Sequence, residues 1–328
     1  MTHLSALFIG GNGIISSACS RLAVAQGFDV TLLNRGRSTT RPPIDGAKTL
    51  VADAADPGAM RAAIGAREFD VVVNFHVFDA GRAAHDIELF SGRTGQYVFI
   101  STAATYQKPV VRIPITESTP QRNPFSPYAQ NKIASETTYI EAYRDRGFPV
   151  TIVRPSHTYD PTLIPLDGGW TVIDRMRRGR KTVIHGDGTS LWTLTHQEDF
   201  ARAFTGLLGN PRIVGDSVHI TSDEALTWDA IAQVLARAAG ADADIVHVAS
   251  AQLVREIPAW EGPIIGDKSY SLVFDNAKIK RLVPGWTATI PFWRGAREIV
   301  AWYDAHPEHQ VVDPDLDQTL DRVAAAAG

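Results

Sequence analysis

The chain has 328 residues, of which 44% are hydrophobic and 21% charged, and its formal net charge is −4. At roughly 100–200 residues per domain, this length predicts about two domains. The composition is close to the globular average, which excludes collagen, coiled-coil and largely disordered classes. The nearly balanced charge provides no electrostatic footprint for tight binding to nucleic acid or to an anionic membrane.

Cysteine content and hydropathy indicate the compartment. The single cysteine, Cys19, can form neither an internal disulfide nor a cysteine zinc cluster, which fits a reducing compartment. The N-terminus lacks the basic region of a signal peptide. No stretch approaches the ~20 apolar residues of a membrane span. We therefore expect a cytoplasmic protein without a membrane partner.

In the first half of the chain, short apolar runs alternate with helix-length amphipathic segments. Strands are predicted at 4–9, 28–33, 48–51, 70–74, 97–101 and 150–154, and helices at 14–26, 57–65, 82–94 and 127–146. Strands rich in Val and Ile, separated by helices, are typical of a parallel sheet that is covered on both faces. The pattern predicts an α/β fold with a doubly wound parallel sheet, the Rossmann fold.

After Pro155 the pattern loosens, beginning with a long loop rich in proline and glycine. Further elements are predicted at 197–208, 217–221, 228–239, 245–248 and 313–328. We predict a Rossmann domain over residues 1–160 and a smaller mixed α/β lobe over 161–328. Residues 197–221 are expected to pack back on the first domain.

The first predicted strand runs into a glycine-rich loop, Gly10-Gly11-Asn12-Gly13-Ile14-Ile15-Ser16. Small residues here allow a tight turn and the close approach of a pyrophosphate to the following helix, whose free N–H groups and dipole favour anions. Ser16 stands where the usual pattern has a third glycine, but it is also small. The loop predicts a dinucleotide site that involves Gly10, Gly13, Ile14 and Ile15.

The end of the second predicted strand bears on the choice of dinucleotide. An acidic residue here would bind the ribose 2′-hydroxyl of NAD, but the chain has Asn34-Arg35-Gly36-Arg37. Asn34 would not repel a 2′-phosphate, and Arg35 and Arg37 could pair with one, unless both are solvated loop residues. The pattern favours NADP over NAD. Asp53 could accept a hydrogen bond from the adenine amino group or could be an ordinary loop residue before a helix.

Three residues further along the chain predict acid–base chemistry. Thr102 follows a predicted strand, while Tyr128 and Lys132 lie one turn apart on one face of a predicted helix. Ser126 is suited to the N-cap of this helix and Pro127 to its first position. A neighbouring ammonium, together with an oxidised nicotinamide, would lower the phenol pKa from its usual value of about 10. Tyr128 could then transfer a proton while a hydride moves at the cofactor.

These motifs, together with Arg154-Pro155-Ser-His-Thr-Tyr159 and His196-x-x-Asp199, resemble the extended short-chain dehydrogenase/reductase superfamily. Within it, the chain is most similar to the NAD-dependent epimerase/dehydratase family, which includes UDP-galactose 4-epimerase. The resemblance implies a C-terminal substrate-binding lobe, bound NAD or NADP, and catalytic roles for Thr102, Tyr128 and Lys132. It also implies cofactor contacts at Lys132 and Pro155, and a homodimer formed by the helices at 82–94 and 127–146.

Departures from the family pattern narrow the expected substrate. Dehydratases carry an Asp-Glu pair where this chain has Ala103-Ala104, so dehydration is not expected. Sugar-nucleotide epimerases have an Asn and a diphosphate-binding Arg where this chain has His157 and Trp192. We therefore expect a carbohydrate-like small molecule without a nucleotide diphosphate, which His157 and Trp192 would contact.

Histidines at two further places in the sequence could bind a ligand or a metal. His76 stands where the family usually has a small residue; it could contact substrate, shift the cofactor or simply pack as a hydrogen-bonded side chain. His306 and His309 flank a proline in an expected surface turn, and no metal site is predicted.

Two functions from different classes follow. The first is an NAD(P)-dependent oxidoreductase or epimerase that acts on a secondary alcohol or ketone of a sugar-like substrate. The alternative is a non-catalytic cofactor-binding or RNA-binding member of the same fold, because the family also contains chloroplast stem-loop-binding proteins. Those proteins have lost the Tyr/Lys pair, whereas this chain retains Tyr128 and Lys132 and has an acidic charge balance.

Overall fold

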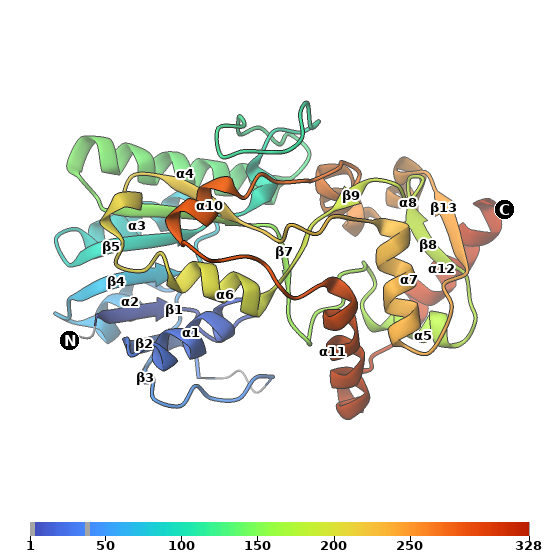
Figure 1. Cartoon of the computed structure of the whole chain (residues 1–328), viewed down its shortest axis with the longest axis horizontal. Helices are drawn as coiled ribbons and strands as arrows, with labels where there is room; N and C mark the ends of the chain where they lie inside the picture. The colour runs from blue at the N-terminus through green and yellow to red at the C-terminus, as the bar shows by residue number, and fades with distance from the viewer. Residues whose placement is uncertain (1–3, 37–39, 328) are drawn as a thin grey trace.

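The computed structural model describes residues 4–36 and 40–327, which form two lobes (Figure 1). Seven parallel strands form one sheet in the order β11-β6-β5-β4-β1-β2-β3. The strands are β1 (Ser5–Ile9), β2 (Asp29–Asn34), β3 (Lys48–Val51), β4 (Phe69–Asn74), β5 (Thr94–Ile100), β6 (Val150–Pro155) and β11 (Ser217–Ile220). The predicted Rossmann-like α/β fold is confirmed.

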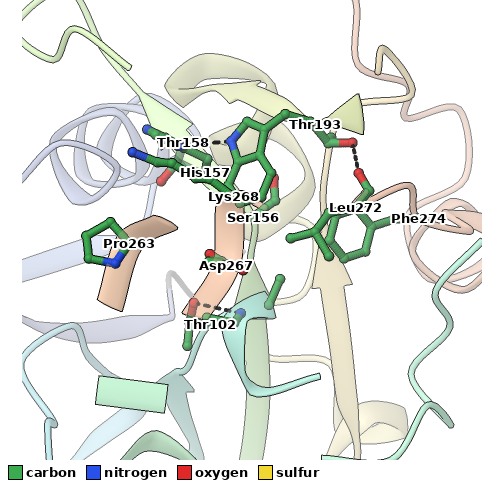
Figure 2. Close-up of a pocket in the computed structure, with 13 residues that line it drawn as sticks. Thr102, Ser156, His157, Thr158, Thr193, Pro263, Asp267, Lys268, Leu272 and Phe274 are labelled. Atoms are coloured by element: carbon green, nitrogen blue, oxygen red, sulfur yellow. Dashed lines mark hydrogen bonds between the residues drawn. The ribbon is translucent and has the colours of Figure 1, made fainter. Parts of the chain in front are cut away.

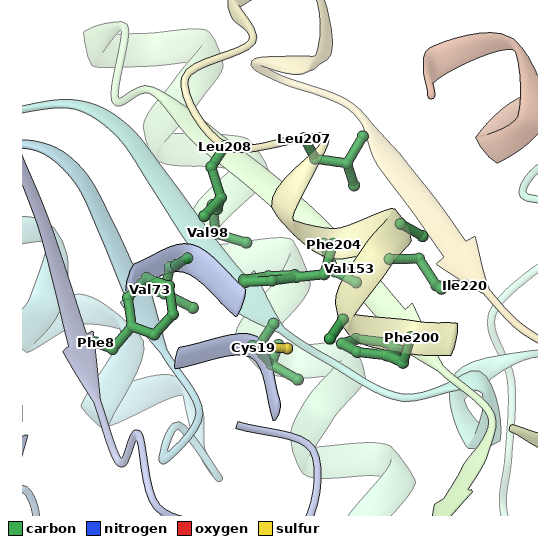
Figure 3. Close-up of a cluster of buried hydrophobic side chains, with 14 of the residues drawn as sticks. Phe8, Cys19, Val73, Val98, Val153, Phe200, Phe204, Leu207, Leu208 and Ile220 are labelled. Atoms are coloured by element: carbon green, nitrogen blue, oxygen red, sulfur yellow. The ribbon is translucent and has the colours of Figure 1, made fainter. Parts of the chain in front are cut away.

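Helices cover both faces of this sheet. They are α1 (Ser16–Ala25), α2 (Pro57–Ile64), α3 (Ala80–Phe90), α4 (Pro127–Arg146), α6 (Gln197–Thr205) and α10 (Ala277–Leu282), with short 3₁₀ turns η1 (Ala103–Thr105) and η2 (Pro211–Ile213). On one face, Phe8 and Val73 of the sheet pack against Cys19 of α1 and Phe200 and Phe204 of α6 (Figure 3). The opposite face packs against α2, α3 and α4. Because both faces are covered, the central strands are almost continuously apolar.

The chain returns twice from the second lobe to the first. In the first return, α6 and β11 join the sheet, with β11 pairing in parallel with β6. In the second return, α10 lies beside the first lobe (Figure 1), where Ile279 and Trp286 enter the same core as Phe8. The sequence predicted the first return but not the second, because a six-residue helix contains too little periodicity to be recognised.

The second lobe is built from short pairs of strands and several helices. Its strands are β7 (His157–Tyr159), β8 (Thr182–His185), β9 (Leu191–Trp192), β10 (Leu194–His196), β12 (Leu226–Thr227) and β13 (Ile245–Val248). Its helices are α5 (Trp170–Arg177), α7 (Trp228–Ala238), α8 (Ser250–Glu256), α9 (Glu261–Pro263), α11 (Phe292–Ala305) and α12 (Pro314–Ala327), with η3 (Pro258–Trp260), the π-helical turn η4 (Ile264–Lys268) and η5 (Pro307–His309). Trp170, Trp192 and Trp228 lie in its core.

The described residues contain neither a membrane-spanning helix nor a cluster of metal ligands. Within residues 4–36 and 40–327, no helix combines the length and the apolar character that a membrane span requires. In the same ranges, His, Cys, Asp and Glu side chains form no group of three that could hold a metal ion.

Candidate active site

The carboxyl ends of β1, β2, β3 and β4 border a cavity of about 500 Å³, called here the glycine-loop groove. Its lining includes Gly10, Asn12, Gly13, Asn34, Arg35, Arg41, Asp53, His76 and Phe78. Parallel strands place the loops that follow them at one edge of the sheet, which is where open α/β sheets bind ligands. The predicted glycine loop and the predicted end of the second strand therefore meet in one cavity.

The glycine loop has the geometry of an anion site. Gly10 has a φ of +83°, which a residue with a side chain rarely adopts. The Ser16 hydroxyl accepts from the Gly13 N–H at 2.6 Å and donates to the Gly10 carbonyl at 2.6 Å, which fixes the turn. Helix α1 has no side-chain N-cap. The Ser17 N–H donates to the Gly13 carbonyl at 3.1 Å, but none of the described residues accepts from the N–H groups of Ile14, Ile15 and Ser16, which remain available to a ligand.

The same loop contains a buried polar atom without a partner. Asn12 Oδ1 is buried, and none of the described residues donates a hydrogen bond to it. An orphaned acceptor beside uncapped helix N–H groups fits a loop whose partners come from a bound molecule. The residues therefore fit a dinucleotide. Ile14 and Ile15 belong to this loop and are half-buried, with Ile15 packed against the α1/α6 core.

The end of the groove beside β2 and β3 carries the residues predicted to select the dinucleotide. Arg35 is exposed at the groove, and the Asn34 side chain accepts from the Gly36 N–H at 2.8 Å. Asp53 is exposed there as well and accepts from the Ala55 N–H at 2.9 Å. Arg41 instead pairs with Asp160 at 2.6 Å. Arg37 lies outside the described residues.

A second cavity, of about 290 Å³, lies between the lobes and is called here the interlobe cavity (Figure 2). Thr102, Ala103 and Ala104 line it from the end of β5, and Ser156, His157 and Thr158 line it from the end of β6. The remaining lining comes from Trp192, Thr193, Pro263, Asp267, Lys268, Leu272 and Phe274. The cavity thus combines strand ends of the first lobe with segments of the second.

His157 and Trp192 form a pair on the wall of the interlobe cavity. The Trp192 Nε1–H donates to His157 Nδ1 at 3.1 Å, so the neutral ring keeps its proton on Nε2. Burial, with a smaller effect of Lys268, lowers the pKa of His157 to about 3. His157 is therefore neutral at physiological pH and presents an N–H donor.

Asp267 and Lys268 line the interlobe cavity but were not predicted. Asp267 lies 3.3 Å from the buried Lys108 ammonium, and burial raises the pKa of its carboxyl. Lys268 pairs with Asp167 at 2.5 Å. The Asn123 amide donates to the Ala104 carbonyl at 2.9 Å and to the Gly266 carbonyl at 2.8 Å, which ties this turn to the end of β5. No sequence motif marks these residues, because only the tertiary fold brings η4 here.

Helix α4 begins as predicted. Ser126 is the N-cap and its hydroxyl accepts from the Ala129 N–H at 3.2 Å, and Pro127 occupies the first position. This start places Tyr128, which is 47% exposed, one turn before Lys132, which is 2% exposed. The Lys132 Nζ lies 5.8 Å from the centre of the Tyr128 ring. The first turns of α4 thus carry a partly exposed phenol and, one turn later, a buried amine.

Lys132 is held by backbone carbonyls. Its Nζ donates to the Val77 carbonyl at 2.6 Å and to the Ile100 carbonyl at 2.8 Å. An ammonium has three donors, so one is left for a ligand. Burial lowers the pKa of Lys132 to about 7, against a smaller opposing effect of Glu136. Phe78, whose ring centre lies 4.9 Å from this Nζ, lines the glycine-loop groove.

Thr102, which lines the interlobe cavity, forms a hydrogen bond with Tyr128. Burial raises the pKa of Tyr128, a hydrogen bond with Thr102 lowers it, and Asp267 raises it further. The net direction is upward, because loss of solvation outweighs the contacts of the phenol. The lowering expected from the sequence includes an oxidised nicotinamide beside the phenol and stays a prediction. Tyr128 therefore keeps its proton at neutral pH among the protein's own groups.

A buried ion pair connects α4 to strand β6 of the sheet. Arg154 of β6 pairs with Glu136 of α4 at 2.5 Å, and the Ser101 hydroxyl donates to the same carboxylate. These contacts join the end of β5 to α4 one turn after Lys132. Removing one partner would leave an uncompensated buried charge, so this pair fixes the position of the helix.

Two other predicted residues lie elsewhere. His76 is exposed and lines the glycine-loop groove but not the interlobe cavity, so a role of His76 in substrate binding stays a prediction. Pro155 ends β6 and is buried, and neither cavity has it in its lining.

The chain belongs to the NAD-dependent epimerase/dehydratase family, whose family model matches residues 6–220. It is 27% identical over 290 residues to 2′-dehydrokanamycin reductase of Streptomyces kanamyceticus, an alignment that covers 86% of this chain and 80% of that protein. It is 27% identical over 257 residues to chloroplast stem-loop binding protein of 41 kDa b of Arabidopsis thaliana, covering 74% of this chain and 65% of that protein.

Solved structures show the same fold. An epimerase from Methanothermobacter thermautotrophicus superposes with a TM-score of 0.77 at 16% identity, covering 94% of both chains. DesIV, a dTDP-glucose 4,6-dehydratase from Streptomyces venezuelae with NAD and TYD bound, superposes with a TM-score of 0.74 at 22% identity, covering 95% of this chain and 100% of that chain. The resemblance found in the sequence is thus confirmed at the level of family and fold.

Proposed function

We propose that the protein transfers a hydride between a nicotinamide dinucleotide and a secondary alcohol or ketone of a small carbohydrate-like molecule. The observation that carries this proposal is a chain of contacts: Thr102, which lines the interlobe cavity, bonds to Tyr128, and Lys132, one turn after Tyr128, lies 4.9 Å from the ring of Phe78, which lines the glycine-loop groove. A reaction that couples a cofactor to a substrate needs its proton donor at the border between the two sites.

The chain's own residues move the proton. The nicotinamide, when bound, supplies or accepts the hydride. In reduction, the Tyr128 hydroxyl donates its proton to the substrate oxygen, and the Thr102 hydroxyl donates a hydrogen bond to the same oxygen. The raised pKa of Tyr128 favours this direction, since the phenol is protonated and able to donate. Lys132 is anchored on two carbonyls and has one further N–H group, which would bind the cofactor ribose.

For the cofactor we propose NADP over NAD. Arg35 is exposed at the groove, where its guanidinium could pair with a 2′-phosphate. None of the described residues at the end of β2, namely Leu33, Asn34, Arg35 and Gly36, is acidic. Asp53 would accept from the adenine amino group, and Gly10, Gly13, Ile14 and Ile15 would surround the pyrophosphate.

The interlobe cavity favours a substrate without a nucleotide diphosphate. None of the described residues that line it is an arginine. The charge of Lys268 is already matched by Asp167 at 2.5 Å. The available groups are instead a neutral His157, hydroxyl side chains and the Asp267 carboxylate, which suit the hydroxyl groups of a polyol. The relative named 2′-dehydrokanamycin reductase supports the choice of net reduction over epimerisation.

A substrate screen tests the proposal. The purified protein is assayed with NADPH and NADH against ketoses and oxidised glycosides, and against nucleotide-linked sugars as a second panel. Mass spectrometry under native conditions identifies any dinucleotide that copurifies. We expect NADPH oxidation with an unphosphorylated ketone. Epimer formation with retained NAD would replace reduction by epimerisation, and activity only on nucleotide-linked sugars would overturn the substrate class.

We also propose a homodimer through α3 and α4, which pack side by side in the first lobe. Light scattering coupled to size exclusion measures the mass in solution, and a monomer across micromolar concentrations would refute the dimer.

A further inference from the structure

His76 lies directly on the glycine loop. A methyl group added to Gly10 would lie 2.1 Å from Cδ2 and 2.5 Å from Nε2 of His76, so the imidazole rests against the Gly10 backbone. The His76 N–H donates to Asn74 Oδ1 at 2.8 Å, which fixes the backbone after β4. No described residue forms a hydrogen bond with the ring itself, and the side chain is exposed to the groove. The ring nitrogens are therefore available to a molecule bound at the loop.

Charged groups from several elements act on the His76 imidazole. Arg35 follows β2, Arg82 belongs to α3 and Lys132 belongs to α4, and all three lower the pKa of His76 after the larger effect of burial. Asp53, after β3, acts in the opposite direction. Asp79 and His85 share a smaller neighbouring cavity with His76. Arg82 itself pairs with Asp86 at 3.2 Å. Burial and the nearby cations together favour the neutral imidazole, and a polyanion at the loop would favour the protonated form.

We propose that His76 is a ligand of the cofactor diphosphate and that its imidazole takes up a proton when the diphosphate binds. This inference rests on the dinucleotide site of the proposed function and adds a residue to it. Bound at the N-terminus of α1 beside Gly10, the diphosphate would offset the positive charge of Arg35 and favour a charged imidazole. The protonated ring then donates a charge-assisted hydrogen bond to a phosphate oxygen.

The proposal predicts the direction of a pH effect on binding. A group that holds its proton more tightly in the complex makes affinity rise as the pH falls, between the pKa of the complex and that of the free protein. The pKa of His76 is lowered in the free protein, and the proposal requires the diphosphate to raise it above neutrality in the complex, which makes the effect extend across neutral pH. We expect ADP-ribose to bind about tenfold more tightly at pH 6 than at pH 8.

Isothermal titration calorimetry with ADP-ribose tests this. The probe contains the diphosphate but has neither a nicotinamide nor a phosphate that titrates near neutrality. Titrations at pH 7 in two buffers of different ionisation enthalpy measure the protons taken up. We expect uptake by the wild type and none by His76→Gln, which can donate a hydrogen bond but cannot titrate. His85→Gln, the matched control, should behave as the wild type.

Other outcomes separate the alternatives. Lys132→Met should keep the proton uptake; its loss there would assign the proton to Lys132 and overturn the proposal. If His76 merely blocks the loop, His76→Ala binds ADP-ribose more tightly than the wild type at every pH, which also contradicts it. Equal proton uptake by His76→Gln and the wild type overturns the role of His76 alone. No binding of ADP-ribose by the wild type at any pH removes the dinucleotide site as well.

Discussion

The two cavities are built in different ways. The glycine-loop groove is formed by loops that directly follow β1 to β4 of one sheet, and all of its lining residues lie between Gly10 and Phe78 in the sequence. The interlobe cavity draws on Thr102, His157, Trp192, Asp267 and Phe274, which the chain brings together from both lobes. The first depends on backbone geometry close in sequence, and the second on tertiary packing. In the proposed function, cofactor binding and substrate choice are therefore assigned to separate parts of the molecule.

This division predicts separable effects of mutation. A change in one cavity should alter the ligand of that cavity and leave the other ligand unaffected. Residues at the border, Tyr128 and Lys132, should instead affect the reaction itself.

Tyr128→Phe should produce the largest effect. Without the phenol proton, turnover should fall by roughly 10²–10⁴, the usual contribution of general acid–base catalysis. The Kd for the dinucleotide should not change, because the phenol lies outside the glycine-loop groove. Steady-state kinetics and calorimetry measure the two quantities. Tyr143→Phe, on the exposed end of the same helix, is the control, and full activity in Tyr128→Phe would contradict the assignment.

Arg35→Ala should affect the glycine-loop groove alone. Losing a charge-assisted hydrogen bond of about 1.5–3 kcal/mol should weaken NADP binding by roughly 10- to 100-fold. NAD binding should change little, because NAD has no 2′-phosphate. Calorimetric Kd values for both dinucleotides measure the difference, with Arg61→Ala on the exposed side of α2 as control. Undiminished NADP binding would remove Arg35 from the site.

Lys132→Met tests the burial of the amine through stability. The pKa of Lys132 is lowered to about 7 in the folded protein, against about 10.4 in the unfolded chain. Between these values the unfolded state binds more protons, so the wild type gains stability as the pH rises, and the variant lacks this gain. Lowering the pH from 9 to 7 should therefore favour the variant by about 2 kcal/mol. Urea unfolding of both proteins at pH 9 and pH 7 measures the difference in their free energies of unfolding. If this difference is the same at both pH values, Lys132 titrates normally and the prediction is wrong.

Trp192→Phe should have the smallest effect, confined to the interlobe cavity. The variant keeps a ring but loses the hydrogen bond to His157 Nδ1. A hydrogen bond of about 0.5–1.5 kcal/mol predicts a change in substrate KM of roughly two- to tenfold, with the dinucleotide Kd unchanged. Trp286→Phe removes an indole donor to the Asp199 carbonyl in the first lobe and is the matched control. Equal KM shifts in both variants would indicate a general loss of stability.

The sequence predicted much of the first lobe because its signals are local. Strands and helices alternate there, and the ends of α4 are marked by Ser126, Pro127 and Gly147. The glycine loop and the residues after β2 could be placed from spacing, and the structure brings them into one groove.

The remainder depends on contacts that no local pattern encodes. Asp267 reaches the interlobe cavity because Asn123 bridges the carbonyls of Ala104 and Gly266, residues far apart in the sequence. His76 was recognised as unusual, but only the structure shows that its ring rests on Gly10. The sequence also does not show that burial raises the pKa of Tyr128 among the protein's own groups, because burial of a side chain is a tertiary property.

Isotope transfer tests the central claim most directly. The protein is incubated with nicotinamide dinucleotide deuterated at C4 on one face or the other, together with the ketone found in the screen, and the product is analysed by mass spectrometry and NMR. The account predicts one deuterium on the secondary carbon, from one face only, and loss of this transfer in Tyr128→Phe. A product without deuterium from either face, or equal transfer in Tyr128→Phe, would contradict it.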